Sequence, residues 1–351
     1  MRVLVRILVL MAVLLGTLVG SATAKRHGPL VLHPKWHRVA GSKNVEVLTS
    51  GRYAYIGGSG AVGSGTGSGV LIDELTGKRV NVAIPAGCFL DSNSSPIGGS
   101  WLVATCNVGQ PAAPYELYSI PAGTWTPFTP NVKQMFAFNA DCKTGDPQCG
   151  ASVAAIANQW IEFLVTCGYH CGPTTFAFQN LQTGQVDDQP PDWKPGGTEI
   201  PNLNSPILTQ HLCKPLKVPD GFTDPTTNQT LPGTISFYGR FVVAQQWSPG
   251  NLNIHTYLAR CGSGLHKLID PNDWPLAGNA HAIIWTLGFA NPTPGRSPQA
   301  LPVQGLFLPT LRRFTITTPS AASVVALSAK HIYAATPGPH GGVYEAQAPS
   351  R

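Results

Sequence analysis

Histidines on apolar segments are the residues in this sequence best suited to proton transfer. His255, His281 and His331 each lie in a strand-like stretch of a different repeat, so their side chains could converge at a common axis. Imidazole acts as a general base or a metal ligand near neutral pH. Histidines on strands also serve as packing or hydrogen-bonding residues, and the ten histidines form no H-x-H pair. Convergence of the three histidines at one axis is therefore one hypothesis, and a structural role for each of them is the alternative.

Carboxylates are the second group that could do chemistry. Glycoside hydrolysis needs two acids flanking the scissile bond, and the chain has only 17 Asp and Glu. The candidates sit on predicted strands or turns, where solvated structural roles are common: Asp73, Glu74, Glu116, Asp187 and Asp188. The G-x-S-x-G motif of serine hydrolases is absent from the sequence. We therefore predict no catalytic residue.

Two segments could bind a metal ion. Asp141 and Asp146 could ligate calcium, which prefers several oxygen ligands. Cys167, His170 and Cys171 have a spacing compatible with zinc, but no partner pair with structural-zinc spacing stands nearby. A solvated loop and a disulfide are the simpler interpretations, and we predict no metal.

A glycine-rich segment, Gly58 to Gly63, matches G-x-G-x-x-G and follows a predicted strand. A dinucleotide site requires this motif to open a helix whose N-terminus holds the pyrophosphate. Here the segment runs through further Gly and Ser into another strand. We interpret it as a hairpin loop and predict no cofactor.

Eight cysteines indicate disulfide bonds in an oxidising compartment. The sequence alone leaves every pairing open. Proximity along the chain favours these four pairs: Cys88 with Cys106, Cys142 with Cys149, Cys167 with Cys171, and Cys213 with Cys261.

The N-terminus predicts export. Arg2 and Arg6 form a basic start, an apolar stretch follows from Ile7 to Gly20, and small residues precede Lys25. This is the pattern of a cleaved signal peptide, and the apolar stretch is short for a membrane span. We expect residues 1–24 to be a signal peptide and 25–351 to be one secreted or cell-envelope domain. An uncleaved anchor is the alternative, and no later apolar span appears.

Charge and composition narrow the class of protein. Of 23 Lys and Arg, two lie in the signal, so 21 face 17 acids after cleavage. This mild excess, taken as spread over the whole chain, differs from the clustered basic field of nucleic-acid-binding proteins, so we predict no nucleic-acid partner. Only 11% of residues are charged, and Gly and Pro number 38 and 32. Such a chain is poor in helix formers, which favours an all-β fold.

A repeat organises the chain. Six copies have a short polar or glycine-containing lead, an apolar strand and then a further strand, often ending in a turn with glycine such as Gly77, Gly123 or Gly184. The apolar strands are marked by Tyr53, Trp101, Trp160, Phe241, Ile284 and Ile332. Propeller blades repeat at about 40–50 residues. Several of these strands are apolar on both faces, which is typical of burial between neighbouring sheets.

These features predict a disulfide-stapled β-propeller of six blades, with seven as the alternative. A Pro-rich insertion around 187–233 is either a loop or a degenerate blade. The segment Trp36 to Leu48 could complete the final sheet and latch the ring. A pair of β-sandwiches or a β-helix is the competing fold class.

The alternation of a G-x-aromatic strand with a strand ending in a T-G turn resembles the secreted bacterial β-propellers of the WD40, quinoprotein-like and YVTN-like group. The resemblance implies a fold and no activity. We expect a monomeric, non-catalytic binding module for an extracellular protein, glycan or small ligand. The alternative is an extracellular carbohydrate-active enzyme with its site at the axial pocket.

Overall fold

The structure is a computed structural model of the whole chain. It divides the chain into two units, residues 1–30 and 31–351, and every described residue except Leu30 belongs to the second. The described residues are 30–41, 45–50, 52–58, 67–91, 96–106, 114–139, 141–142, 149–157, 159–167, 175–188, 234–238, 241–247, 254–260, 266–267, 273–279, 281–287, 303–319, 323–336 and 341–350. The predicted signal peptide, residues 1–24, lies outside them.

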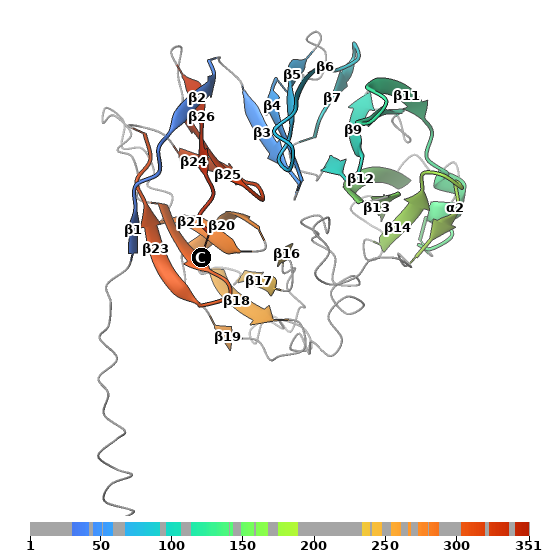
Figure 1. The fold of residues 1–351 in the computed structure, drawn as a ribbon. Coiled ribbons are helices and arrows are strands. Elements are labelled where there is room, and N and C mark those ends of the chain that lie inside the picture. Colours follow the sequence, from blue (N-terminus) through green and yellow to red (C-terminus); the bar gives the residue numbers. More distant parts are fainter. Residues whose placement is uncertain are drawn as a thin grey trace, which may run out of the picture. The chain divides into compact units, whose positions relative to one another are not determined.

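The described strands form six sheets of mainly antiparallel strands, which we number in chain order (Figure 1). Sheet 1 consists of β3 (Glu46–Thr49), β4 (Tyr53–Gly57), β5 (Ser68–Asp73) and β6 (Arg79–Ala83). Sheet 2 consists of β7 (Cys88–Phe89), β8 (Ile97–Gly98), β9 (Trp101–Cys106), β10 (Tyr115–Ser119) and β11 (Thr124–Phe128). Sheet 3 consists of β12 (Cys149–Ala157), β13 (Trp160–Cys167), β14 (Thr175–Asn180) and β15 (Val186–Asp187). A short helix, α2 (Val132–Phe136), connects sheets 2 and 3.

Sheets 4 to 6 repeat the same order. Sheet 4 consists of β16 (Thr234–Tyr238), β17 (Phe241–Trp247), β18 (Ile254–Arg260) and β19 (His266–Lys267). Sheet 5 consists of β20 (Asp273–Gly278), β21 (Ala282–Leu287), β22 (Val303–Phe307), β23 (Arg312–Ile316) and β1 (Leu30–Leu32). Sheet 6 consists of β24 (Ser323–Leu327), β25 (His331–Thr336), β26 (Gly342–Gln347) and β2 (His37–Ala40).

The predicted repeat corresponds to these sheets, and the all-β prediction is confirmed. In sheet 2, β7 and β8 both pair with β9, and we count them together as the first strand. Each marker residue then lies on the second strand of its sheet, and the strand that the repeat places after it is the third. The glycine-rich segment connects β4 to its antiparallel neighbour β5, with Gly57 opposite Gly69, as expected for a hairpin connection. Most of that segment lies outside the described residues, as does most of the Pro-rich insertion at 187–233.

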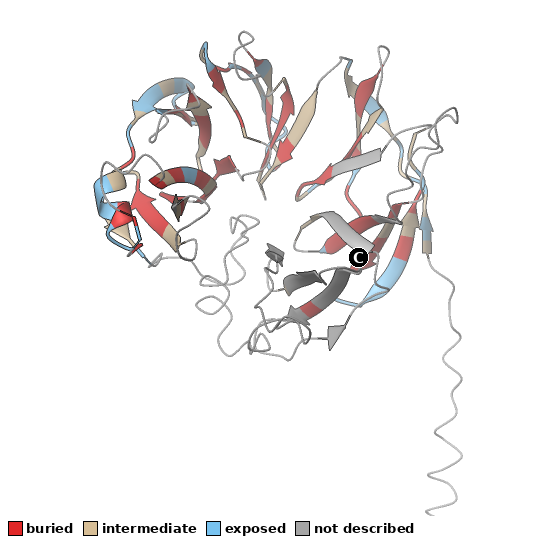
Figure 2. Cartoon of the chain, turned by 180° about the vertical axis from the view of Figure 1, so that it is seen from behind, coloured by how far each residue is buried: buried red, intermediate tan, exposed pale blue. Residues whose placement is uncertain are grey.

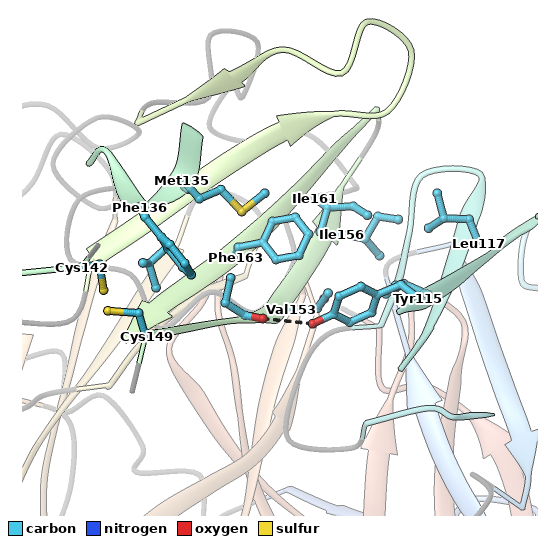
Figure 3. Close-up of a cluster of buried hydrophobic side chains, with 14 residues drawn as sticks. Tyr115, Leu117, Met135, Phe136, Cys142, Cys149, Val153, Ile156, Ile161 and Phe163 are labelled. Atoms are coloured by element: carbon cyan, nitrogen blue, oxygen red, sulfur yellow. Dashed lines mark hydrogen bonds between the residues drawn. The ribbon is translucent and has the colours of Figure 1, made fainter. Parts of the chain in front are cut away.

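Hydrophobic clusters join several pairs of neighbouring sheets, and residues of the second strands contribute to them. On β13, Ile161 and Phe163 belong to a cluster that also contains Val103 and Tyr115 of sheet 2, and the Tyr115 hydroxyl donates to the carbonyl oxygen of Ala151 at 3.2 Å (Figure 3). Corresponding clusters join sheet 1 to sheet 2, sheet 1 to sheet 6, and sheet 4 to sheet 5. Alternate residues of a strand point to opposite faces, so a second strand can pack on two neighbouring sheets, as β4 does through its clusters with sheets 2 and 6.

Burial follows this arrangement. Buried residues concentrate on the central strands, and exposed residues on outer strands and turns (Figure 2). Among the described residues, no helix has the length and apolar character needed to cross a membrane.

The N-terminal segment completes two sheets formed mainly by the C-terminal part of the chain. β2 pairs with β26, with His37 opposite Glu345. The expectation that this part of the chain joins the final sheet is therefore confirmed for His37–Ala40 and wrong for Glu46–Thr49, which opens sheet 1 instead. Upstream, β1 adds to β23, and the indole of Trp36 donates to the carbonyl oxygen of Thr317 at 2.9 Å.

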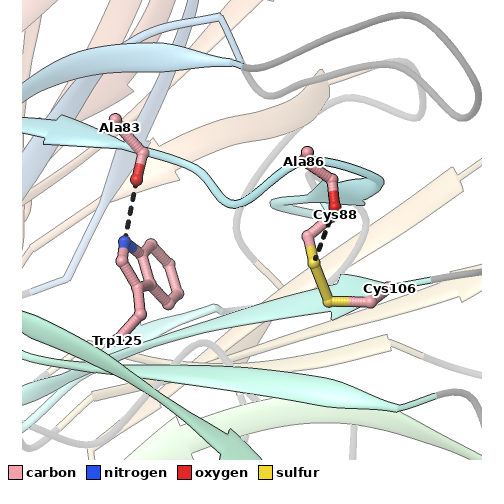
Figure 4. The surroundings of a disulfide bond; sticks show 5 residues. All are labelled: Ala83, Ala86, Cys88, Cys106 and Trp125. Carbon is pink, nitrogen blue, oxygen red and sulfur yellow. Dashed lines mark hydrogen bonds between the residues drawn. A yellow bond between two sulfur atoms is a disulfide. The ribbon is translucent and has the colours of Figure 1, made fainter.

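One predicted disulfide is formed. Cys88 and Cys106 are opposite each other in the register of β7 and β9 and are bonded. Figure 4 shows this bond together with Trp125, whose indole donates to the carbonyl oxygen of Ala83 at 2.8 Å. The disulfide holds sheet 2 at the end where β9 finishes.

The predicted bond between Cys142 and Cys149 is not formed, which corrects the sequence-based pairing. Both side chains are buried. Each sulfur lies beside a backbone carbonyl: Cys142 Sγ is 3.5 Å from the oxygen of Thr166, and Cys149 Sγ is 4.0 Å from that of Asp141. Of the other candidates, Cys171, Cys213, Cys261 and the side chain of Cys167 lie outside the described residues, so their pairing stays a prediction.

Candidate functional site

Four sheets share one turn between their third and fourth strands, and this turn positions the candidate site. We number the turn from the last residue of the third strand, which is position one. In each turn, the residue at position two donates its backbone N–H to the carbonyl of the residue that precedes the second strand. These donors are Glu74, Ile120, Leu181 and Leu308, and the acceptors are Arg52, Ser100, Gln159 and His281. Three of the four donors are apolar. Glu74 therefore places a carboxylate where the repeat otherwise has a hydrophobic side chain.

The residue before Glu74 fixes the turn. Asp73 Oδ1 accepts the backbone N–H of Leu75 at 2.9 Å, and Asp73 also forms a two-point ion pair with Arg52, whose Nη2 lies 2.9 Å from Oδ2. The hydrogen bonds from Arg52 hold the pKa of Asp73 below its ordinary value. The turn closes with Gly77 at φ +73°, a conformation that glycine adopts without steric cost.

Glu74 is held by two side chains of sheet 6. Its Oε2 lies 2.5 Å from Nδ1 of His331, and its Oε1 accepts the hydroxyl of Tyr333 at 2.6 Å. The side chain of Glu74 has no exposed surface, whereas that of His331 is 32% exposed. The carboxylate is thus buried between sheets, and the imidazole connects it to solvent.

The titration of the three groups is coupled. Burial raises the pKa of Glu74, but hydrogen bonds from His331 and Tyr333 outweigh burial, so the pKa lies below its ordinary value. The hydrogen bond to Glu74 raises the pKa of His331 against the opposing effect of burial. Burial and then the bond to Glu74 raise the pKa of the Tyr333 hydroxyl. The preferred state is an ionised Glu74 beside a protonated His331 and a neutral tyrosine.

Further polar contacts cross the same boundary between sheets 1 and 6. Arg79 Nη2 lies 2.8 Å from Oε1 of Glu345, and Lys330 Nζ donates to the carbonyl oxygen of Leu75 at 2.9 Å. A neighbouring carboxylate oxygen, Oε2 of Glu345, is buried without a hydrogen-bond partner in the described structure. The boundary between the first and last sheets therefore combines apolar packing with a charged network.

This arrangement can orient an imidazole and exchange a proton. Nδ1 of His331 is bound to Glu74, so exchange with solvent or a ligand must use Nε2. A buried carboxylate that orients a histidine occurs in catalytic and metal-binding sites. Within the described residues, however, no three His, Cys, Asp or Glu side chains come together to hold a metal ion.

The described histidines among the three predicted ones make different kinds of contact. His331 joins the network with Glu74, whereas His281 is exposed and uses its backbone, accepting from Leu308 and donating to Asn279. The side chain of His255 lies outside the described residues. Convergence of the three stays a prediction, and the partner of His331 is a carboxylate instead.

The remaining acids have separate positions. Glu116 is half-buried on β10, and Asp187 is half-buried on β15. Burial and the adjacent Asp187 raise the pKa of Asp188. Asp141 is described, but Asp146 lies outside the described residues. The calcium hypothesis is therefore not tested.

Sequence reasoning missed Glu162, the most isolated acid in the described structure. It lies on β13, is 1% exposed, and neither of its carboxylate oxygens has a hydrogen-bond partner there. Burial raises its pKa to about 8. By strand alternation it lies on the opposite face from Ile161 and Phe163, beside Trp160, whose indole nitrogen is likewise buried without a partner.

A signal for Glu74 was present in the sequence. Aligning the glycine turns at Gly77, Gly123 and Gly184 places Glu74 opposite Ile120 and Leu181. An ionisable residue at an otherwise apolar repeat position predicts a buried partner. Nothing in the sequence identified that partner as His331 or Tyr333.

Solved structures resemble this chain in fold, and 205 chains match. One is the β-propeller domain of the trilobed protease from Pyrococcus furiosus, described as having an open velcro topology, at 7% identity and a TM-score of 0.38 over 88% of this chain and 82% of that one. An oligogalacturonate lyase from Vibrio parahaemolyticus has 8% identity and a TM-score of 0.45, covering 92% and 98%. A fungal alcohol oxidase in complex with copper has 12% identity and a TM-score of 0.44, covering 90% and 76%.

No protein-family model and no curated protein matches the sequence. At these identities the likeness to solved structures concerns the fold alone.

Proposed function

We propose that this chain is an exported, six-bladed β-propeller that acts as a non-catalytic binding module for an extracellular protein, glycan or small ligand. The single observation that carries the proposal is a difference between the two ends of the sheets. Connections from second to third strands have 5 to 15 residues, whereas those from first to second and from third to fourth have 2 to 5. Long, varied loops on a rigid scaffold are the usual place for binding residues.

The connections between consecutive sheets add to the same end, because antiparallel strands return there. They include 129–148, which contains α2, and 188–233. The short-turn end is instead closed by repeated backbone hydrogen bonds, such as those from Glu74 and Ile120. One end is thus specialised for scaffold closure, which leaves the long-loop end for recognition.

Cysteine positions support this assignment. The Cys88–Cys106 disulfide lies at the long-loop end, where β9 finishes. Cys149 begins β12 and Cys167 ends β13 at the corresponding end of sheet 3. Covalent restraint of loops lowers the entropy lost on binding, so the Cys88–Cys106 disulfide suits a preorganised binding surface.

Six blades are supported by six consecutive sheets, of which sheet 1 packs on both sheet 2 and sheet 6. The completion of sheet 6 by β2 supports ring closure by the N-terminal segment. Under this proposal the Glu74–His331–Tyr333 network stabilises the junction of the first and last blades.

A glycan microarray and a panel of immobilised extracellular proteins test the proposal. For the strongest probe, the 58–67 connection is replaced by Asn-Gly, and a matched control carries Thr76→Ala at the short-turn end. We expect the loop variant to lose binding and the control to retain it, with unchanged thermal unfolding in both. Loss of binding only in the control, or conversion of the probe to a new product seen by mass spectrometry, would contradict a non-catalytic long-loop site.

A further inference from the structure

Acidic residues are absent from two long stretches of this chain. From Lys25 onward the first acid is Glu46, and Asp273 is followed by none before Glu345. These stretches, 25–45 and 274–344, hold nine Lys and Arg, whereas the rest of the chain from Lys25 has 12 against all 17 acids. The two stretches therefore carry a net charge of +9, and the rest of the chain from Lys25 carries −5. The expectation that the basic excess is spread evenly is wrong.

The topology brings described strands of the two acid-free stretches together. β1 pairs with β23 and β2 pairs with β26, so these two N-terminal strands lie along sheets 5 and 6. These two sheets are also neighbours through β20 and β24. The only acids on their strands are Asp273 and Glu345, and Glu345 is paired with Arg79.

Exposed cations occupy this region, which we call the basic edge. Lys35 and Arg38 are exposed on the N-terminal segment, and Arg312 is exposed where β23 begins. Arg38 donates to the carbonyl oxygen of Gly341 at 3.0 Å, which is a neutral acceptor. A region that has exposed cations and few acids attracts anionic surfaces.

Two apolar side chains are also exposed on the basic edge. Val31 on β1 is 49% exposed, and Leu311, in the turn before β23, is 55% exposed. Leu311 occupies the fifth position of the shared turn, where Gly77, Gly123 and Gly184 stand, and has φ +53°. A left-handed conformation is unfavourable for a residue with a Cβ. The fold alone favours glycine here, so an exposed leucine points to a contact outside the chain.

We propose that the basic edge docks on an anionic lipid surface. Basic residues supply attraction to lipid headgroups, and each contributes on the order of a fivefold gain in partitioning. Val31 and Leu311 supply apolar area that can enter the headgroup region. A soluble polyanion would bind the cations but would make no apolar contact with Val31 or Leu311. The exposed apolar side chains therefore favour a lipid surface. The net negative remainder of the chain is repelled from the same surface, which orients the molecule.

Vesicle co-sedimentation tests this proposal with the exported product, its N-terminus fixed by mass spectrometry. Probes are phosphatidylglycerol–phosphatidylcholine vesicles and vesicles of phosphatidylcholine alone. We expect binding to the first only, weakened by salt. Lys35→Gln combined with Arg312→Gln should weaken binding roughly tenfold or more. Leu311→Gly should weaken it separately while keeping the fold, because the turn geometry suits glycine.

The matched control is Lys78→Gln combined with Lys133→Gln, which removes the same charge from exposed positions on the rest of the chain. It should bind as the unmodified protein does. Equal weakening in the control would show that net charge alone matters and would overturn the proposal. Equal binding to phosphatidylcholine would also overturn it. Tight binding to soluble polyphosphate, unaffected by Leu311→Gly, would identify a polyanion instead of lipid. These outcomes are independent of the long-loop site.

Discussion

Glu74 and His331 are 257 positions apart in the sequence, and Oε2 of the first lies 2.5 Å from Nδ1 of the second. The pair joins a turn of the first sheet to the second strand of the last. Since Glu74 has no exposed side-chain surface, its charge depends on His331 and Tyr333 for compensation. Removing a partner from a buried charge costs more than the pair itself contributes.

The Glu74–His331 pair predicts a bell-shaped pH dependence of stability. Glu74 has a lowered pKa, so its contribution is present above its ordinary value of 4.5 and is lost as pH falls through the folded value. His331 has a raised pKa, so its contribution is complete below its ordinary value of 6.5 and is lost as pH rises through the folded value. Both contributions are complete between these two ordinary values.

His331→Ala should lower the free energy of unfolding by about 2 kcal/mol or more in that window. Urea denaturation across pH measures it. His281→Ala, at an exposed position of the neighbouring sheet, is the control and should change little. A flat pH profile for the unmodified chain would rule out the coupling.

Breaking the disulfide between Cys88 and Cys106 should destabilise sheet 2. The two residues are 18 positions apart, and closing a loop of this size stabilises a protein by about 3 kcal/mol. Cys88→Ala combined with Cys106→Ala should lower the free energy of unfolding by about that amount. Mass spectrometry of unreduced peptides must find the two cysteines linked, and thiols at both positions would refute the bond.

The shared turn predicts opposite effects of two substitutions. Gly77→Ala forces a Cβ into φ +73° although nothing lies within 4 Å of it, so backbone strain of about 1 kcal/mol is the expected loss. Leu311→Gly relieves strain but adds freedom to the unfolded chain, so stability should stay equal or rise by up to about 1 kcal/mol. Differential scanning calorimetry measures both. A clear loss of stability in Leu311→Gly would mean that the leucine packs within the chain.

Glu162 predicts a loss of stability with rising pH. Its pKa is about 8 in the folded chain, above the ordinary 4.5, so folding favours the protonated form and stability falls as pH rises from 4.5 to 8. Glu162→Gln removes this ionisation. The variant should therefore have a flatter stability profile between those values, and its advantage over the unmodified chain should grow with pH. If the stability advantage of the variant became smaller as pH rises, this would instead indicate a cation beside the Glu162 carboxylate.

Local pattern was enough to locate the second and third strands. Trp101 and Trp160 begin strands with buried residues on both faces, and this burial is visible as mainly apolar sequence. The first and fourth strands were not identified, because strands as short as β7 and β15 carry too few residues to show a period. Their pairing is decided by neighbouring strands.

The candidate site depended on contacts that no local pattern contains. Glu74 was recognised as an acid on a turn, but its burial follows from packing against β25. His331 was recognised on a strand, but its partner comes from the first sheet. The disulfide at Cys88 was predictable because its partner is near in sequence, whereas Cys142 shows that nearness alone does not determine a bond.

The pairing of β2 with β26 also sets an order in time. Arg38 leaves the ribosome 303 residues before Gly341, the residue whose carbonyl it binds. Sheet 6 cannot be completed until β26 has been synthesised, so β2 has no partner strand before that point. Contacts this distant along the chain fold slowly. A chain that stops before β26 would therefore present β2 with an open edge, which makes the completed sheet a marker of synthesis through Gln347.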